Sequence, residues 1–298
     1  MMRDRVMISF SGGRSSAVMT KMVHADCVRR GIPVVTVFAN TGAEHPATLD
    51  FVRDVETHWS IPIVWVEAVT HKGERKGSTH KVVTYETASR DGEPFRLMSH
   101  KYGMPGPAFP NCTRELKLNP IKSYLRSIGW SAGSYTSAIG IRADEVDRIR
   151  IKELDSGEVF YPLVDAGITK EMVGAIMASE PFDLRLPGDH YGNCVTCYKK
   201  TSRKLMTIAQ DDPSWFDLFK RIEDECAELP FHGMEPQRRP FFRKHMTVRD
   251  MLKAAKDAQF DRYEDSRQLS LYDLGMGIDD LDVGGGCGES CEIFADDA

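Results

Sequence analysis

The chain has 298 residues, 41% of them hydrophobic, enough for one large α/β domain or one domain with a smaller addition. Its formal net charge of −5 excludes a global positive field that would attract nucleic acid. No apolar run reaches the ~18 residues of a membrane span and no signal peptide precedes the first strand pattern, so we expect a cytoplasmic protein without membrane contact.

The first third of the chain alternates between strand and helix patterns. Apolar runs at 6–10, 33–39 and 61–66 are typical of strands, and the pattern at 48–59 is typical of a helix. A further helical pattern, with Val18 on its apolar side, follows the first run. Strands that alternate with helices indicate βαβ units. We therefore predict an α/β fold with a Rossmann-like parallel sheet flanked by helices.

The rest of the chain divides into an irregular stretch, further α/β elements and a helical part. The stretch 70–110 loses all periodicity, and so long an irregular segment is more often functional or mobile than idle. Further elements are expected as helices at 116–128, 169–178 (with Thr169 as N-cap), 202–210, 213–228 and 247–259 and as strands at 135–141 and 159–164.

These patterns predict three parts of the chain. Residues 1–190 form an α/β nucleotide-binding domain, 191–273 a cysteine-containing helical addition, and 274–298 a flexible tail rich in Gly and Asp.

A glycine-rich loop, SGGRSS at 11–16, stands directly between the first strand and its helix. Glycines let main-chain N–H groups approach a ligand closely, and the helix N-terminus favours an anion. Arg14 adds a positive charge. The loop matches neither a Walker A loop nor a dinucleotide fingerprint. Taken alone, it is equally consistent with phosphate binding and with a plain strand-to-helix turn.

Several motifs occur together in one order along the first 205 residues. They are SFSGGRSSA at 9–17, FANTGAEHPAT at 38–48, CTRELK at 112–117, GIRADE at 140–145, YPL at 161–163 and GNCVTC at 192–197. This set resembles the phosphoadenosine-phosphosulfate reductase branch of the ATP pyrophosphatase (adenine nucleotide alpha hydrolase) superfamily. The resemblance implies a HUP-type Rossmann-like domain that binds an adenine nucleotide.

The resemblance also assigns residues to the nucleotide. The candidates are Ser11, Gly12, Gly13, Arg14, Ser15, Ser16, Asn40, Thr41, Gly42, Glu44, Gly140 and Arg142. Branch members either reduce an adenylyl sulfate or cleave ATP to AMP and pyrophosphate. The complete Ser-Gly-Gly loop looks more like the ATP-cleaving kind, because several reductases carry a degenerate loop.

Three cysteines in family-like motifs are the candidate metal ligands. Cys194 and Cys197 form a CxxC turn that can share a metal or cluster, and Cys112 lies in its own motif. Three ligands suit a [4Fe–4S] cluster with one open iron, as in the DndC-like iron–sulfur branch that the sequence resembles. Two alternatives stay open: a Zn²⁺ site completed by His100 or His190, and simple buried or redox-active thiols.

The remaining cysteines fall into two groups. Cys27 and Cys226 lie in helical patterns and are expected to be ordinary buried thiols. Cys287 and Cys291 lie in the tail, where a mobile cysteine is expected to attack or deliver sulfur; a fourth cluster ligand and a functionless, disulfide-prone end are the alternatives.

Two charged motifs complete the candidate site. Arg142 is expected to bind a phosphate or sulfate, and Asp144 (or the neighbouring Glu145) to help hold Mg²⁺; local salt bridges at a helix start are the alternative. The cluster at 238–245 interleaves cations with Phe241 and Phe242, as nucleic-acid contacts do, although a solvated surface is the commoner explanation of such a run.

The sequence therefore favours an ATP-dependent enzyme that adenylates an acceptor and couples this to sulfur transfer. The expected ligands are ATP with Mg²⁺ and either a [4Fe–4S] cluster or Zn²⁺. The expected partners are a sulfur donor, such as sulfide or a cysteine desulfurase, and a sulfur acceptor, for which nucleic acid is one candidate. A homodimer is one expectation for the assembly. The alternative functions are a phosphosulfate or adenylyl-sulfate reductase and a non-catalytic nucleotide-binding protein.

Overall fold

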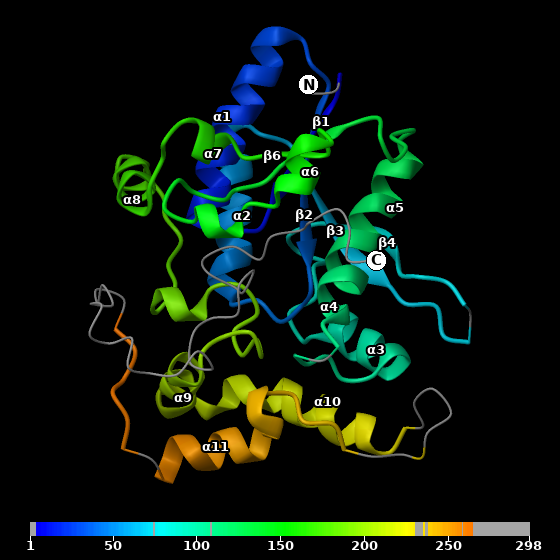
Figure 1. The fold of residues 1–298 in the computed structure, drawn as a ribbon, viewed down its shortest axis with the longest axis vertical. Helices are drawn as coiled ribbons and strands as arrows, with labels where there is room; N and C mark the ends of the chain where they lie inside the picture. Colours follow the sequence, from blue (N-terminus) through cyan, green and yellow to red (C-terminus); the bar gives the residue numbers. More distant parts are fainter. Residues whose placement is uncertain are drawn as a thin grey trace.

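The structure is a computed structural model that describes residues 4–264 except 74, 108, 230–234, 236–237 and 258. The tail cysteines Cys287 and Cys291, and the whole expected tail 274–298, lie outside the described residues. Within the described part, an α/β unit with a central sheet packs against a group of helices formed by the later residues (Figure 1).

A six-stranded sheet forms the centre of the α/β unit, in the order β4-β3-β2-β1-β5-β6. All neighbouring strands pair in parallel except β4, which is antiparallel to β3. The strands are β1 (Val6–Phe10), β2 (Val34–Asn40), β3 (Ile63–Val69), β4 (Thr79–Val83), β5 (Thr136–Ala138) and β6 (Val159–Phe160). The predicted α/β fold with a mostly parallel sheet is confirmed.

Helices cover both faces of this sheet and form the second unit. They are α1 (Arg14–Arg30), α2 (Pro46–Trp59), α3 (Glu93–Tyr102), α4 (Asn111–Thr113), α5 (Asn119–Ser127), α6 (Ile151–Asp155), α7 (Pro162–Asp165), α8 (Lys170–Ala178), α9 (Ser202–Asp211), α10 (Asp217–Ala227) and α11 (Val248–Asp257). A π-helical turn, η1 (Arg114–Leu118), joins α4 to α5, and short 3₁₀ turns are η2 (Val146–Arg148), η3 (Asp189–Tyr191), η4 (Pro213–Phe216) and η5 (Arg243–His245).

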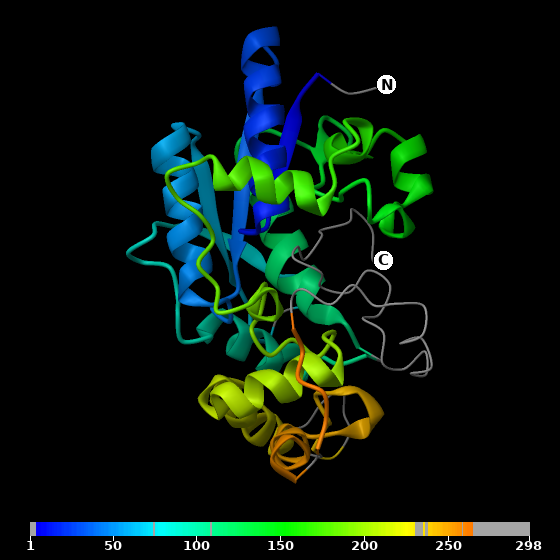
Figure 2. The same cartoon turned by 90° about the vertical axis from the view of Figure 1, so that its left-hand side faces the viewer.

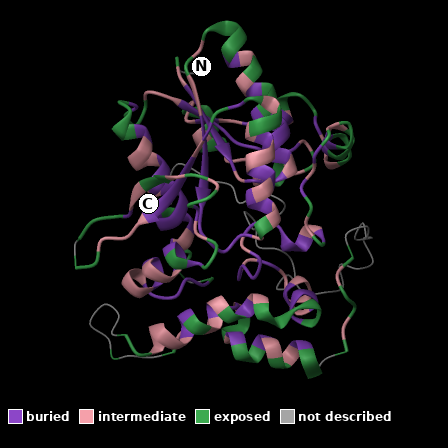
Figure 3. Cartoon of the chain, turned by 180° about the vertical axis from the view of Figure 1, so that it is seen from behind, coloured by how far each residue is buried: buried purple, intermediate pink, exposed green. Residues whose placement is uncertain are grey.

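The central strands are apolar because both of their faces are covered. All five residues of β1 are buried, as a strand in the middle of a parallel sheet requires. One face packs on α1 and α2 through Val18, Val52 and their neighbours, and the other packs on α5 through Ile121 and Leu125. The central strands are accordingly mostly buried, and the helices expose their outer sides (Figure 3).

The later helices have a hydrophobic core of their own. Phe216, Phe219 and Ile222 pack there with Phe241, and α3 contributes Phe95 to the same core. Seen from the side, these helices lie beneath the end of the α/β unit (Figure 2). The second core therefore joins chain segments on both sides of residue 190.

The stretch 70–110, expected to be irregular, contains two regular elements. β4 adds an antiparallel edge strand, and α3 follows it. Only two residues of β4 are apolar and its burial is partial, so a half-exposed edge strand leaves little pattern in the sequence. The prediction that residues 70–110 lack regular secondary structure was therefore wrong.

Two other expectations are corrected in detail. The strand expected at 159–164 ends at Phe160, because Pro162 opens α7 and a helix accommodates proline in its first turn. Thr169 stands at the N-cap of α8, but its hydroxyl donates to the Glu171 carboxylate and does not cap the helix.

Candidate functional site

The glycine loop (residues 11–16) links the carboxyl end of β1 to α1. Gly12 has φ +81°, and a Cβ there would lie 2.6 Å from the Thr48 methyl carbon, so only glycine fits. Gly13 is the N-cap of α1 and has no side chain to cover the first-turn N–H groups. Ser16 Oγ accepts from Ser11 Oγ (2.9 Å) and donates to the Gly13 carbonyl (2.9 Å). The serines thus hold the loop's shape while the helix N-terminus stays open to an anion.

The end of β5 lies directly against this loop. A Cβ at Gly140 would stand 3.1 Å from Ser16 Cα, which shows how closely the two backbones approach. Arg142 is buried, and its Nη1 donates to Ser15 Oγ at 3.1 Å. β1 and β5 are neighbours at which the chain order of the strands reverses, the place where open α/β sheets bind ligands.

Asp144 orients the Arg142 guanidinium. Its carboxylate accepts from Nε at 3.0 Å and from Nη2 at 3.1 Å, and it also accepts from the Lys170 backbone N–H. Partial burial opposes ionisation of Asp144, but the hydrogen bonds and positive charge of Arg142, together with backbone N–H donors, lower its pKa below the usual value. Asp144 is therefore an ionised carboxylate beside the glycine loop.

The Arg14 side chain is occupied by a carboxylate from another segment. Its guanidinium donates to both oxygens of Asp183 (2.7 and 2.9 Å) and to the Leu184 carbonyl. It ties the glycine loop to the segment after α8, and its charge is matched there. Among the arginines of the site, Arg142 is the one whose guanidinium donates to a side chain of the loop.

The turn after β2 (residues 40–44) is folded by its own side chains. Asn40 Nδ2 donates to Glu67 Oε1 (2.7 Å) and its Oδ1 accepts from the Gly42 N–H. The Glu44 carboxylate accepts from the Thr41 hydroxyl (2.7 Å) and from the Thr41 and Ala43 N–H groups. The turn is therefore rigid, and it lies beside the glycine loop because β2 pairs with β1.

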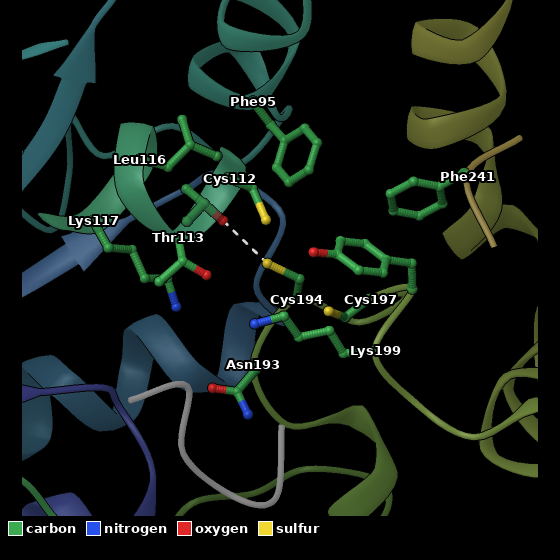
Figure 4. Close-up of a pocket in the computed structure, with 12 residues that line it drawn as sticks. Phe95, Cys112, Thr113, Leu116, Lys117, Asn193, Cys194, Cys197, Lys199 and Phe241 are labelled. Atoms are coloured by element: carbon green, nitrogen blue, oxygen red, sulfur yellow. Dashed lines mark hydrogen bonds between the residues drawn. The ribbon is translucent and has the colours of Figure 1, made fainter. Parts of the chain in front are cut away.

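The three candidate metal ligands line one pocket. It has an empty volume of about 420 Å³, part of it open to solvent, and lies between η1, the CxxC segment and the second core. Its lining residues are Thr41, Phe95, Cys112, Thr113, Leu116, Lys117, Asn193, Cys194, Cys197, Tyr198, Lys199 and Phe241. The sulfur atoms of Cys112, Cys194 and Cys197 point toward the same space (Figure 4). We call this the cysteine pocket.

The cysteine pocket is attached to the turn after β2. The Thr41 hydroxyl lies 3.5 Å from Cys194 Sγ, the contact drawn as a dashed line in Figure 4. The Val195 N–H donates to the Ala43 carbonyl at 3.0 Å, and Asn193 adopts a left-handed φ of +58° that lets the chain turn there. The glycine loop and the cysteine pocket therefore share residues 40–44 as a common wall.

A single-ion site and its expected histidine ligands can be compared with the residues of the pocket. Among the described residues, no group of three or more His, Cys, Asp or Glu is close enough to hold a single metal ion. A zinc ion with ~2.3 Å bonds would need its sulfurs about 4 Å apart. Neither His100, which pairs with Glu225, nor His190 lines the pocket. The expected Zn²⁺ site therefore has no histidine of this pair in the pocket lining.

Three side chains that the sequence analysis did not single out shape the site. Glu67, fully buried, holds Asn40 and accepts from the Ser89 N–H. Lys200, also buried, donates to the His190 and Val195 carbonyls on either side of Cys194. Glu115 on η1 accepts from Ser78 and Arg114, which lowers its pKa although burial opposes this. The sequence signal that could have identified Glu67 is its position as a charged residue within the apolar run of a strand.

The aromatic residues of the cluster at 238–245 are not exposed. Phe241 and Phe242 are 0% and 2% exposed and stack in the second core. Arg238 pairs with Asp224, which Arg249 also binds. The two rings are therefore not available for base stacking, the alternative that the interleaved pattern raised beside a solvated surface.

Two thiols outside the site behave as expected. Cys27 is a buried residue of α1, and burial raises its pKa. Cys226 is half-buried, donates to the Ser99 carbonyl, and burial raises its pKa to about 11. In the part of the chain that the structure describes, no helix combines the length and apolarity needed to span a membrane.

Residues 5–153 match the phosphoadenosine phosphosulfate reductase domain. The chain belongs to this family, whose matched region contains the glycine loop, the turn after β2, Cys112 and Arg142. The domain identifies a nucleotide-binding enzyme of the family. Cys194 and Cys197 lie beyond the matched residues.

Two curated proteins are similar to the chain. It is 32% identical over 293 residues to the uncharacterized nin region protein ORF290 of Escherichia phage lambda, an alignment that covers 96% of this chain and 94% of that protein. It is 30% identical over 120 residues to the uncharacterized protein MJ0066 of Methanocaldococcus jannaschii, which covers 40% of this chain and 19% of that protein.

Proposed function

We propose that the protein is an ATP-dependent enzyme that adenylates an acceptor, releases pyrophosphate and transfers sulfur at the cysteine pocket. The observation that carries this proposal is the shared wall: Thr41 contacts Cys194 at 3.5 Å, and the same turn lies beside the glycine loop. An intermediate activated at the loop would thus be formed next to the thiols.

The glycine loop suits the phosphates of ATP. The uncapped N-terminus of α1 offers N–H donors and a favourable dipole, and Gly12 and Gly140 let the loop pack closely on α2 and on the end of β5. In an adenylyl transfer, an acceptor oxygen attacks the α-phosphorus and forms a new P–O bond. The bond between the α-phosphorus and the bridging oxygen breaks, and pyrophosphate leaves with the electron pair.

Arg142 and Asp144 are given separate roles in this step. Arg142, buried beside Ser15, would stabilise negative charge that develops on the phosphate oxygens. Asp144 holds the guanidinium in place and would supply one oxygen ligand to Mg²⁺, which proteins bind through one or two carboxylates together with substrate phosphates.

The cysteine pocket is proposed for the sulfur. Cys112, Cys194 and Cys197 would hold a [4Fe–4S] cluster, which when bound supplies an iron coordination site open to sulfur. Lys117 and Lys199 line the pocket and would stabilise an anionic sulfur substrate. Sulfide, from a donor such as a cysteine desulfurase, would attack the adenylated carbon of the acceptor. The carbon–sulfur bond forms, the carbon–oxygen bond breaks, and AMP leaves.

A phosphosulfate or adenylyl-sulfate reductase is the second candidate, favoured by the family to which the chain belongs. In that reaction a tail cysteine, Cys287 or Cys291, would attack the sulfate sulfur. Those residues lie outside the described part of the chain, whereas the complete glycine loop is observed and suits a polyphosphate.

The two candidates differ in their ligands and products. We expect anaerobically prepared protein to bind ATP more tightly than phosphoadenosine phosphosulfate in calorimetric titration, and to release AMP and pyrophosphate from Mg-ATP rather than ADP. Parallel incubations with adenylyl sulfate and phosphoadenosine phosphosulfate, with a thiol reductant, should yield no sulfite. Sulfite release without pyrophosphate release from ATP would replace the first proposal with the second.

A further inference from the structure

Two segments of the chain concentrate positive charge, although the whole chain is net negative. Residues 70–84 contain four Lys or Arg and one Glu, and residues 94–127 contain six Lys or Arg and one Glu. A bias of this size in a chain of net charge −5 leaves the rest of the molecule strongly acidic. Positive charge is therefore concentrated in these two segments, and negative charge in the rest of the chain.

The fold brings these two segments together. Lys101 Nζ and the Tyr102 hydroxyl both donate to the Lys76 carbonyl (2.6 and 3.1 Å), and the ring of His80 bonds the Ser123 hydroxyl at 2.8 Å. β4 thus lies against α5, and the hairpin that leads into β4 contacts the end of α3, on one side of the molecule (Figure 1). We call the resulting surface the basic face. Its exposed cations are Lys72, Arg75, Lys76, Lys81, Arg114 and Arg126.

Two carboxylates that pair with exposed cations of the basic face lie beneath it, whereas Arg96 of the second segment pairs with the partly exposed Glu93 and Glu225. Glu67 pairs with Lys81 and is fully buried, and Glu115 pairs with Arg114 and is 2% exposed. Among the described residues of the two segments, Glu115 is the one acidic residue. The side that faces solvent therefore carries positive charge.

The basic face continues into the cysteine pocket. η1 carries Arg114 on the face and Lys117 in the pocket lining. Phe109 stands three residues before Cys112 and is 52% exposed, an uncommon position for a large aromatic side chain. Along the chain, the exposed Phe109 therefore precedes Cys112 of the pocket and Arg114 of the basic face by a few residues.

We propose that the basic face binds the backbone of a single-stranded or unpaired segment of nucleic acid, with Phe109 stacking on a base beside the cysteine pocket. Cations that follow a backbone together with aromatic platforms are the means by which proteins hold single strands. A base within a duplex cannot reach a recessed pocket without leaving its stack. The inference rests on the proposed sulfur transfer for the chemistry at the pocket, whereas binding itself is independent of it.

The test measures binding without catalysis. Fluorescence anisotropy with the full chain and fluorescein-labelled DNA and RNA strands of about 20 nucleotides, a length that exceeds typical single-strand site sizes, gives affinity against salt concentration. The face variant carries Lys72→Gln, Arg75→Gln, Lys76→Gln and Arg126→Gln. The matched control carries Arg29→Gln, Arg30→Gln, Lys152→Gln and Lys256→Gln, four exposed cations elsewhere that change net charge equally.

We expect the wild type and the control variant to bind the strands with equal affinity. The face variant should bind at least about tenfold more weakly at 0.1 M salt. The slope of log affinity against log salt concentration should become shallower by about 0.7 for each phosphate contact that is lost. Phe109→Ala should weaken single-strand binding about fivefold or more and leave the salt slope unchanged. ATP binding should stay intact in all variants, so a failure of the nucleotide proposal would be recognised separately.

Three results would overturn the inference. The first is no binding of either strand by the wild type at low salt. The second is an equal loss in the face variant and the control, which would assign the effect to net charge. The third is competition by poly-glutamate as effective as that by unlabelled nucleic acid, which would indicate an acidic protein partner instead.

Discussion

The glycine loop and the cysteine pocket lie on the same turn after β2 but are built in different ways. The loop depends on backbone shape, with Gly12 at φ +81° and an uncapped helix N-terminus, and it is formed by consecutive residues. The pocket depends on side chains from distant segments, since Thr41 and Cys194 are 153 residues apart in the chain.

The difference teaches how each site should respond to change. A backbone site tolerates changes in exposed side chains but fails when a Cβ enters a position that has no space for it. A side-chain site loses one ligand at a time. The predictions below use this contrast, in order of decreasing effect.

The largest effect is expected at Gly12. Gly12→Ala adds a Cβ 2.6 Å from the Thr48 methyl carbon at a left-handed φ, so the loop must move. We expect loss of measurable ATP binding by calorimetry and a lower free energy of unfolding.

Gly133→Ala is the matched control, because its φ of +82° is the same and no atom lies within 4 Å of the new Cβ. It should cost roughly 1–2 kcal/mol of stability from the backbone alone and leave ATP binding unchanged. ATP affinity equal to wild type in folded Gly12→Ala protein would remove the loop from the site.

The next effect concerns the three cysteines. Cys112→Ala, Cys194→Ala and Cys197→Ala should each lower the iron content of anaerobically prepared protein, which for the wild type should be brown. ATP binding should persist, because the glycine loop does not use these side chains. Cys226→Ala is the control: its thiol lies outside the pocket lining and should not affect iron. Stoichiometric zinc without iron in the wild type would contradict the cluster.

The smallest effect is expected at Arg142, where a side chain assists a backbone site. Arg142→Lys keeps the charge but loses the planar fork that holds Ser15 and Asp144, so pyrophosphate release should slow by roughly tenfold. Arg148→Lys is the control, an equally buried guanidinium that pairs with Glu145. If both variants keep wild-type rates, Arg142 serves only the local salt bridges.

The sequence could predict the parts of this molecule that are local. The β1–loop–α1 unit and the parallel strands follow from runs of consecutive residues, and family motifs point to Cys112 although it is distant from the CxxC turn. Gly12 rather than Gly13 proves to be the constrained glycine, since Gly13 has an ordinary φ of −99°. That distinction depends on Thr48, a residue of the next helix.

Features that depend on long-range packing escaped prediction. β4 is apolar at only two positions, so its pairing with β3 is visible only in three dimensions. Phe241 and Phe242 alternate with cations in sequence but point into a core formed with α10 and α3. Glu67 accepts a hydrogen bond from Asn40 on another strand, and Lys200 donates to backbone carbonyls. Sequence spacing does not predict partners of either kind.

The long reach of the cysteine pocket has a consequence for the order in which the protein matures on the ribosome. Chains fold from their N-terminal end during synthesis. The nucleotide loop has its partners once the chain has emerged through Asp189, which pairs with Arg14, whereas the pocket lining is complete only when Phe241 has emerged and packed. Cys112 lacks Cys194 and Cys197 beside it until the chain has emerged through Cys197. The three thiols of this pocket therefore come together late in synthesis, and the wall around them is completed only by the second core.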